Sequence, residues 1–141
     1  MRKEGEREEK YGPPVLVKAK ELAGFTLRVT MNEKNFPKRY RFSITDRMQN
    51  KAMQILEELT IANEIYPDTY IEFDKRRLHM KEARASIRAL IALAEVAVAT
   101  FPVKPSTFAE WTRAASELQK QITGWIKYDD ARFAYLNRIE K

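Results

Sequence analysis

Four basic side chains recur at helical spacing in the second half of the sequence, where together they could bind phosphate groups. They are Arg77, Lys81, Arg84 and Arg88, which follow one another at spacings of four, three and four residues. This spacing places all four on one face of a helix, where like charges repel each other and do not stabilise the helix. A bound polyanion would turn that repulsion into attraction, and arginine can hold two phosphate oxygens at once. The pattern favours nucleic-acid contact, whereas the simpler alternative is a helix face that is merely solvated.

A second group of basic residues lies between positions 34 and 51, where six lysines and arginines stand against one carboxylate, Asp46. The net charge of this segment is therefore +5. Binding through the two groups would be largely independent of base sequence and would weaken steeply as the salt concentration rises. Aromatic residues do not alternate with the basic residues of the helical group, so stacking on single-stranded bases is not indicated. The candidate phosphate contacts are Lys38, Arg39, Arg41, Arg47, Lys51, Arg77, Lys81, Arg84 and Arg88.

No residues of this sequence are spaced as in a known catalytic or metal-binding motif. Cysteine is absent and His79 is the single histidine, which excludes disulfide scaffolds, thiolate zinc sites and cysteine nucleophiles. The Glu-x-x-His motif of di-iron bundles is missing, because Arg76 stands three positions before His79. His79 could touch a phosphate or stack on a base, but a partly exposed helix residue with no task is the simpler interpretation. We expect no catalytic residue, no cofactor, no metal ion and no enzymatic activity.

Length and composition fit one small domain with its own core. The chain has 141 residues, of which 26 are Lys or Arg and 20 are Asp or Glu, so its net charge is +6. No apolar run approaches the roughly 20 residues of a membrane span, and no signal-peptide pattern is present. We expect a soluble, cytoplasmic protein without a membrane segment.

Apolar residues at alternating spacings of three and four predict four helices. Their ranges are about 15–35, 44–66, 72–100 and 106–127. Ser43 or Thr45 is expected to cap the second helix, and Ser106 or Thr107 the fourth, with Glu110 completing a capping box. Residues 69–74 could begin the third helix or form a link, and we favour a loop that leads into the helix by about residue 72. Short proline-marked turns between these helices predict an all-α, antiparallel up-down-up-down four-helix bundle.

The sequence also predicts where the bundle begins and ends, and which residues contact its core or a second subunit. Residues 1–12 are predicted to be a disordered charged tail, residues 13–128 the bundle, and residues 129–141 a weakly helical C-terminal tail in which Phe133, Leu136 and Ile139 could make contacts. The second half of the third helix is apolar nearly all round, so it lies in the middle of the bundle or a second chain covers it. A glycine inside a helix usually marks close approach by a neighbour. The candidate core or subunit contacts are Leu93, Val96, Trp111, Gly124 and Trp125.

The segment from Phe36 to Asn63 resembles accessory variability determinant proteins of diversity-generating retroelements. In that family a turn of the form F-P-K-x-x-R-F-x-[LI] leads into R-[IM]-x-x-x-[AL]-x-x-[IL]-x-E-x-[LI]-x-x-A. Gly124-Trp125-Ile126-Lys127 is similar to the closing G-W-[IL]-K of the family, and the likeness covers about residues 15–128. The matching positions of the first segment are Phe36, Pro37, Lys38, Arg41, Phe42, Ile44, Arg47, Met48, Ala52, Ile55, Glu57, Leu59 and Ala62.

This resemblance implies a homopentameric barrel of four-helix bundles with a basic surface and no catalytic activity. Such a protein would bind the reverse transcriptase of its element together with template RNA or DNA, and would support mutagenic retrohoming. A sister group, the four-helix proteins encoded in ribosomal-RNA intervening sequences, shares the architecture. The alternative is therefore a homo-oligomeric protein-interaction scaffold whose basic face meets an acidic partner and never touches nucleic acid.

Overall fold

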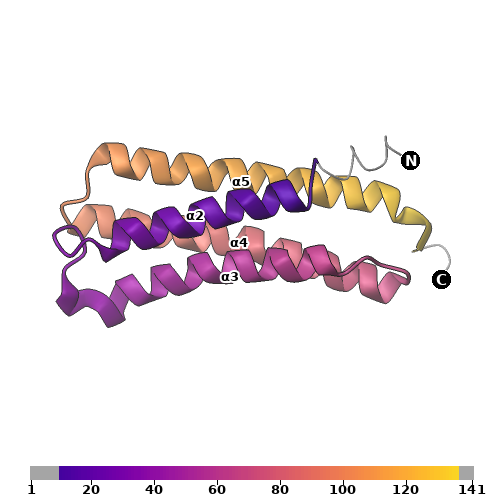
Figure 1. Ribbon diagram of the computed structural model, residues 1–141, viewed down its shortest axis with the longest axis horizontal. Coiled ribbons are helices and arrows are strands. Elements are labelled where there is room, and N and C mark those ends of the chain that lie inside the picture. Colours follow the sequence, from indigo (N-terminus) through magenta and orange to yellow (C-terminus); the bar gives the residue numbers. More distant parts are fainter. Residues whose placement is uncertain (1–9, 137–141) are drawn as a thin grey trace.

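Four long antiparallel helices make up the computed structural model, which describes residues 10–136 (Figure 1). They are α2 (Pro13–Met31), α3 (Asp46–Glu64), α4 (Tyr70–Thr100) and α5 (Pro105–Arg132). A 3-10 turn (Lys38–Tyr40) and a π-helical turn (Arg41–Thr45) connect α2 to α3. The predicted all-α bundle of four antiparallel helices is confirmed. The pentameric assembly stays a prediction.

Most of the predicted N-terminal tail (residues 1–9) and the last residues of the C-terminal tail (137–141) lie outside the described residues. Among the helices of residues 10–136, none combines the length and the hydropathy that crossing a bilayer would require.

The helices form a ring in which each packs against its neighbours in sequence, and α5 closes the ring onto α2. The predicted apolar stripes point into the centre of this ring. On α4, for example, Met80, Ile87 and Leu90 are each at most 1% exposed. Burial of these stripes is the main source of bundle stability, because most of the stability of a helix in a protein comes from the packing of its apolar face.

Several helices begin or end at other residues than predicted, because the expected capping hydrogen bonds are not the ones that form at these positions. Thr45 has helical backbone angles and caps nothing, since the π-helical turn runs directly into α3. Pro105 opens α5 after Lys104 without any side-chain cap, so the expected capping box of Thr107 and Glu110 is wrong. The capping box of this protein lies elsewhere, at Thr69 and Glu72, and it starts α4 at Tyr70 instead of residue 72. The first helix ends at Met31, four residues before its predicted end at 35.

The predicted end of the fourth helix at residue 127 is also wrong, because α5 continues to Arg132. Segment 129–136, which we expected to begin a weakly helical tail, packs against the bundle. Phe133 and Leu136 are 2% and 3% exposed and form a second small core with Phe73, at the start of α4. Burial of these aromatic and aliphatic groups stabilises the last turns of α5.

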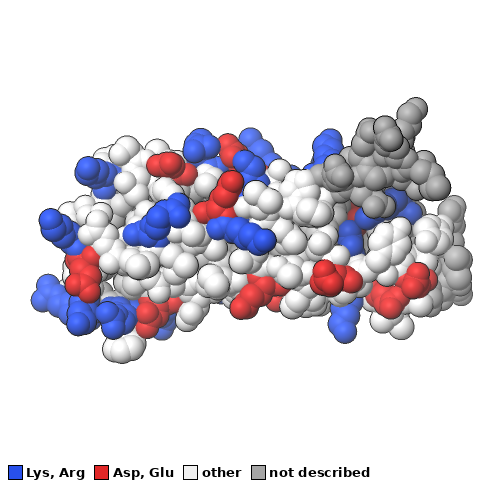
Figure 2. Space-filling model, in the orientation of Figure 1, with Lys and Arg blue, Asp and Glu red and all other residues white. Residues whose placement is uncertain are grey.

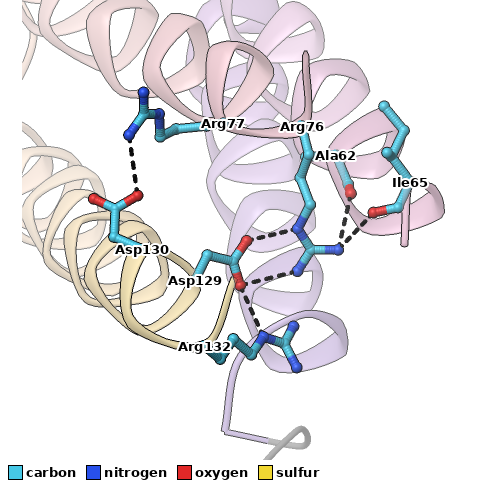
Figure 3. A network of polar contacts seen from close by, with 7 residues as sticks. All are labelled: Ala62, Ile65, Arg76, Arg77, Asp129, Asp130 and Arg132. Atoms are coloured by element: carbon cyan, nitrogen blue, oxygen red, sulfur yellow. Dashed lines mark hydrogen bonds and ion pairs between the residues drawn. The ribbon is translucent and has the colours of Figure 1, made fainter. Parts of the chain in front are cut away.

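A buried guanidinium joins three helices at this end of the bundle (Figure 3). Arg76 donates from Nε and Nη2 to the carboxylate of Asp129, at 2.6 and 3.3 Å. Its Nη1 donates to the carbonyl oxygens of Ile65 and Ala62, at 2.8 and 3.3 Å. Those carbonyls lie at the C-terminal end of α3, where the carbonyl of Ala62 also accepts from the N–H of Ile65 at 3.2 Å. A cation placed there satisfies free acceptor capacity of the helix end and interacts favourably with the helix dipole. Arg132 adds a donor to Asp129 at 3.2 Å.

Candidate nucleic-acid interface

A groove of about 720 Å³ runs between α4 and α5, and we call it the α4–α5 groove. Four of its lining side chains are basic, and none of the lining residues in the described part of the chain is acidic. The basic residues are Lys81, Arg84 and Arg88 from α4 and Lys120 from α5, and the others are Ala85, Ser116, Gln119 and Thr123. The groove therefore concentrates positive charge in a concave surface that also holds hydroxyl and amide donors.

The two helices place these side chains by the same periodicity that builds the core. Met80 and Ile87 point into the bundle, so residues 81, 84 and 88 lie along the neighbouring face of α4. Arg84 reaches across the groove, where its Nη1 donates to the hydroxyl of Thr123 on α5 at 3.3 Å. This bond links the two walls of the groove.

None of the four basic groove residues takes part in an ion pair within residues 10–136. Their charges are thus not compensated by any ion pair in this part of the chain. Mutual repulsion between them disfavours the unliganded arrangement, and a bound anion would relieve it.

Arg77 lies apart from the other three residues of the predicted basic helix face, which we call the predicted ridge. Its guanidinium pairs with Asp130 at 3.2 Å and with Asp74 at 3.6 Å, and it lies 5.3 Å above the ring of Phe73. Arg77 is not among the residues that line the α4–α5 groove. The structure therefore separates Arg77 from the other three predicted residues of the ridge.

Lys120 is the fourth basic residue of the groove, and the sequence analysis did not predict it. The signal was present as a polar stripe on the fourth helix, where Ser116, Lys120 and Thr123 follow one another at spacings of four and three. This stripe becomes one wall of a basic groove only because α5 packs beside α4.

The second predicted group lies at one end of the bundle, in the connection between α2 and α3. Lys38, Arg39 and Arg41 are exposed there, and Figure 2 shows basic side chains gathered at this end with acidic ones among them. Lys38 and Arg41 line a hollow together with the carboxylates of Glu33 and Asp46. This hollow shares no residue with the α4–α5 groove, so these members of the second group do not line the groove.

Two further candidates of this group lie on α3. Arg47 is exposed and lines an apolar hollow next to Leu93 and Val96. Lys51 is half-buried, and its ammonium donates to the side chain of Gln54 at 3.3 Å. Neither lines the α4–α5 groove.

The candidate core or subunit contacts divide between the interior and the surface. Trp111 and Trp125 are 2% and 1% exposed in the core of this single chain. The indole of Trp111 donates to the hydroxyl of Thr26 at 3.0 Å. Leu93 and Val96 lie on the outside, where they line the apolar hollow of about 290 Å³ beside the π-helical turn.

The space above Gly124 is filled by the chain itself. A Cβ atom at this position would lie 2.7 Å from the hydroxyl oxygen of Tyr11 and 3.2 Å from Cε1 of the same ring. The ring of Tyr11 also contacts Tyr128, with 5.5 Å between the two centroids. The close approach that the glycine indicated is therefore made by the residues that precede α2.

His79 lies in neither basic group. Its Nδ1 is 2.7 Å from Oε2 of Glu58 on α3, and both side chains are largely buried. Glu82, one turn along α4, lies close enough that ligand atoms of all three residues fall within 4.8 Å of one another. His79 thus has a defined partner on another helix, unlike the residue without a task that the sequence suggested.

Comparison with family models, with curated proteins and with solved structures finds no match to this chain. The resemblance in Phe36–Asn63 therefore stays a prediction.

Proposed function

We propose that the protein is a non-catalytic accessory protein of a diversity-generating retroelement. In this role it binds template RNA or DNA and the element's reverse transcriptase, and so supports mutagenic retrohoming. The observation that carries nucleic-acid binding is the α4–α5 groove, with four basic side chains and no carboxylate. The retroelement and the reverse transcriptase rest on the sequence resemblance.

The chemistry of the groove suits a phosphate backbone better than a folded acidic protein. Guanidinium groups hold phosphate oxygens in pairs, and hydroxyl and amide side chains commonly donate to phosphate as well. A concave surface of one charge sign attracts polyanions from a distance. Release of condensed counterions would supply much of the affinity, so binding would be sequence-tolerant and sensitive to salt.

A homopentamer would need an apolar surface for subunit contact. The hollow that Leu93 and Val96 line is one such surface. Phe42, which belongs to the same π-helical turn as the lining residue Ile44, is 83% exposed. A contiguous exposed apolar patch would mark an interaction site. The same hollow supports the alternative function, a homo-oligomeric protein-interaction scaffold with no nucleic-acid role.

Charge reversal in the groove tests nucleic-acid binding. The double variant Arg84→Glu/Arg88→Glu is compared with Lys20→Glu/Arg28→Glu, which changes the net charge equally at exposed positions of α2. Fluorescence anisotropy with a labelled RNA hairpin and a DNA duplex is measured over a range of KCl concentrations. Four phosphate contacts predict a slope of log K against log salt of about −3.6 for the duplex, at about 0.9 per contact.

The groove variant should lose most of its binding and about half of this slope, while the control should keep the wild-type slope. Unchanged affinity in a groove variant that circular dichroism shows to be folded would refute the assignment. Failure of the wild-type protein to bind either probe at low salt would favour the scaffold.

Two further measurements address the rest of the proposal. Light scattering should give a particle mass of five times the 16.5 kDa of one chain. If a reverse transcriptase is encoded beside this gene, its co-expression with the protein should yield a complex that survives size-exclusion chromatography. A monomer or a dimer would reject the pentamer, and separate elution would reject the partnership.

A further inference from the structure

A carboxylate–imidazole–carboxylate cluster bridges α3 and α4 on a side of α4 away from the basic groove. Its members are Glu58 from α3 and His79 and Glu82 from α4. We propose that these three residues bind a divalent first-row transition-metal ion, of which Zn²⁺ is the test case. The ion would fasten α3 to α4, and the site does not depend on the proposed nucleic-acid function.

The geometry is close to that of a bound site. His79 Nδ1 and Glu58 Oε2 are 2.7 Å apart, and the donor atoms of all three residues lie within 4.8 Å of one another. Zinc binds nitrogen and oxygen ligands at about 2.0–2.2 Å, which in a tetrahedral site sets neighbouring ligand atoms roughly 3.4 Å apart. The pair across the helices is hydrogen-bonded in the free protein, so the ion would replace the proton between the two atoms and move them apart by roughly 0.7 Å. Rotation of the exposed Glu82 side chain would complete three ligands.

Partial burial strengthens the cluster as a ligand set. The side chains of Glu58 and His79 are 15% and 21% exposed, so little water competes for their donor atoms. Both are held by helices that pack along their length, which orders the pair before an ion arrives. Glu82 is exposed. The outer side of the cluster thus stays open for an ion to enter and for water to occupy its remaining positions.

The donor types select the class of ion. Two carboxylates balance the charge of a divalent cation, and a neutral imidazole supplies nitrogen. Calcium and magnesium prefer sites made entirely of oxygen ligands, whereas imidazole favours zinc, nickel, copper and iron. Zinc and nickel should therefore both bind. Nickel should bind more weakly than zinc only if the site is tetrahedral.

Sequence reasoning had no access to this site. His79 and Glu82 stand three residues apart in the order His-x-x-Glu, the reverse of the di-iron motif, and Glu58 is 21 residues away from His79. A carboxylate that far along the chain joins the pair only because α3 and α4 are antiparallel neighbours.

Isothermal titration of the full chain with ZnCl₂ tests the proposal. The triad variants are Glu58→Gln, His79→Gln and Glu82→Gln, and Glu57→Gln on the exposed face of α3 is the matched control. Glutamine at position 79 can still hydrogen-bond Glu58, so the fold should persist, and circular dichroism verifies this for each variant.

We expect one Zn²⁺ per wild-type chain, and a loss of affinity of roughly tenfold or more in every triad variant. Glu57→Gln should bind as the wild type does. MgCl₂ should give no saturable heat. Zn²⁺ should also raise the melting temperature of the wild type and of Glu57→Gln, because an ion that binds only the folded state stabilises it.

A second readout is spectroscopic. Co²⁺ bound to the wild type should show visible absorption that changes when His79→Gln removes the nitrogen ligand. Zinc binding that all three triad variants retain would mean adventitious binding to surface carboxylates only and would overturn the proposal. So would the absence of saturable zinc binding in the wild type. Arg84→Glu/Arg88→Glu should bind zinc normally, which keeps this result separate from that of the groove.

Discussion

The guanidinium of Arg76 and the carboxylate of Asp129, 53 residues apart in the chain, form an ion pair in the interior with Nε and Oδ2 2.6 Å apart. Their side chains are 4% and 0% exposed. Arg76 also lies 5.1 Å above the ring of Trp125 and donates to the last carbonyls of α3. This pair therefore ties the start of α4 to the end of α5 and to the end of α3, and Figure 3 shows how the hydrogen bonds of Arg76 converge on its guanidinium.

Asp129→Asn should destabilise the protein by about 3–5 kcal/mol, because it leaves the buried guanidinium of Arg76 without its counter-charge. Asp130→Asn is the matched control. Its carboxylate pairs with Arg77 at 3.2 Å but is 44% exposed, and an exposed pair contributes about 1 kcal/mol or less. Urea unfolding followed by circular dichroism measures both. Equal losses in the two variants would contradict the role given to the buried pair.

Phe133→Ala should destabilise the last turns of α5. The ring is 2% exposed and contacts Phe73 with 5.7 Å between centroids, and truncation of such a ring costs about 3–5 kcal/mol. Tyr135→Ala, at a position that is 44% exposed, should have little effect. Amide hydrogen exchange over residues 125–133 distinguishes the variants. Unchanged protection in Phe133→Ala would show that this segment is a tail after all.

Gly124→Ala should behave differently with and without the ring of Tyr11. In the wild-type background the new Cβ would lie 2.7 Å from the tyrosine hydroxyl, so the ring must move and the substitution gains nothing or destabilises. In a Tyr11→Ala background, the same change should stabilise by about 1 kcal/mol, the helix propensity difference.

A double-mutant cycle by thermal or urea unfolding measures this coupling, and light scattering follows the particle mass. Additive effects would mean that Tyr11 does not fill the space above Gly124. A fall in mass caused by Gly124→Ala would instead place this glycine against a second subunit.

Lys120→Ala should weaken nucleic-acid binding although no sequence pattern singled it out, because Lys120 lines the α4–α5 groove. The salt slope for duplex DNA should fall by about 0.9, the value of one phosphate contact. Arg77→Ala should change neither affinity nor slope, since its guanidinium pairs with Asp130 and Asp74. Fluorescence anisotropy at several salt concentrations compares the two. A larger loss of affinity in Arg77→Ala than in Lys120→Ala would instead place the binding surface on the predicted ridge that includes Arg77.

The number, order and inward faces of the helices followed from the sequence by itself. Met80, Ile87 and Leu90 recur with the helical period, and all three are buried. Such patterns are readable because burial repeats with the period of a single helix, whatever that helix packs against. Three of the four groove cations were found in the same way, since Lys81, Arg84 and Arg88 share one face of α4.

Only the tertiary structure decided which residues meet across helices. Asp129 was assigned to a tail because its own surroundings in sequence are weakly helical, and burial against Arg76 reveals its role. Lys120 joined the groove, and Glu58 joined His79, through helices that lie side by side. Charge and shape complementarity between distant segments has no local period, so it emerges only when the helices pack.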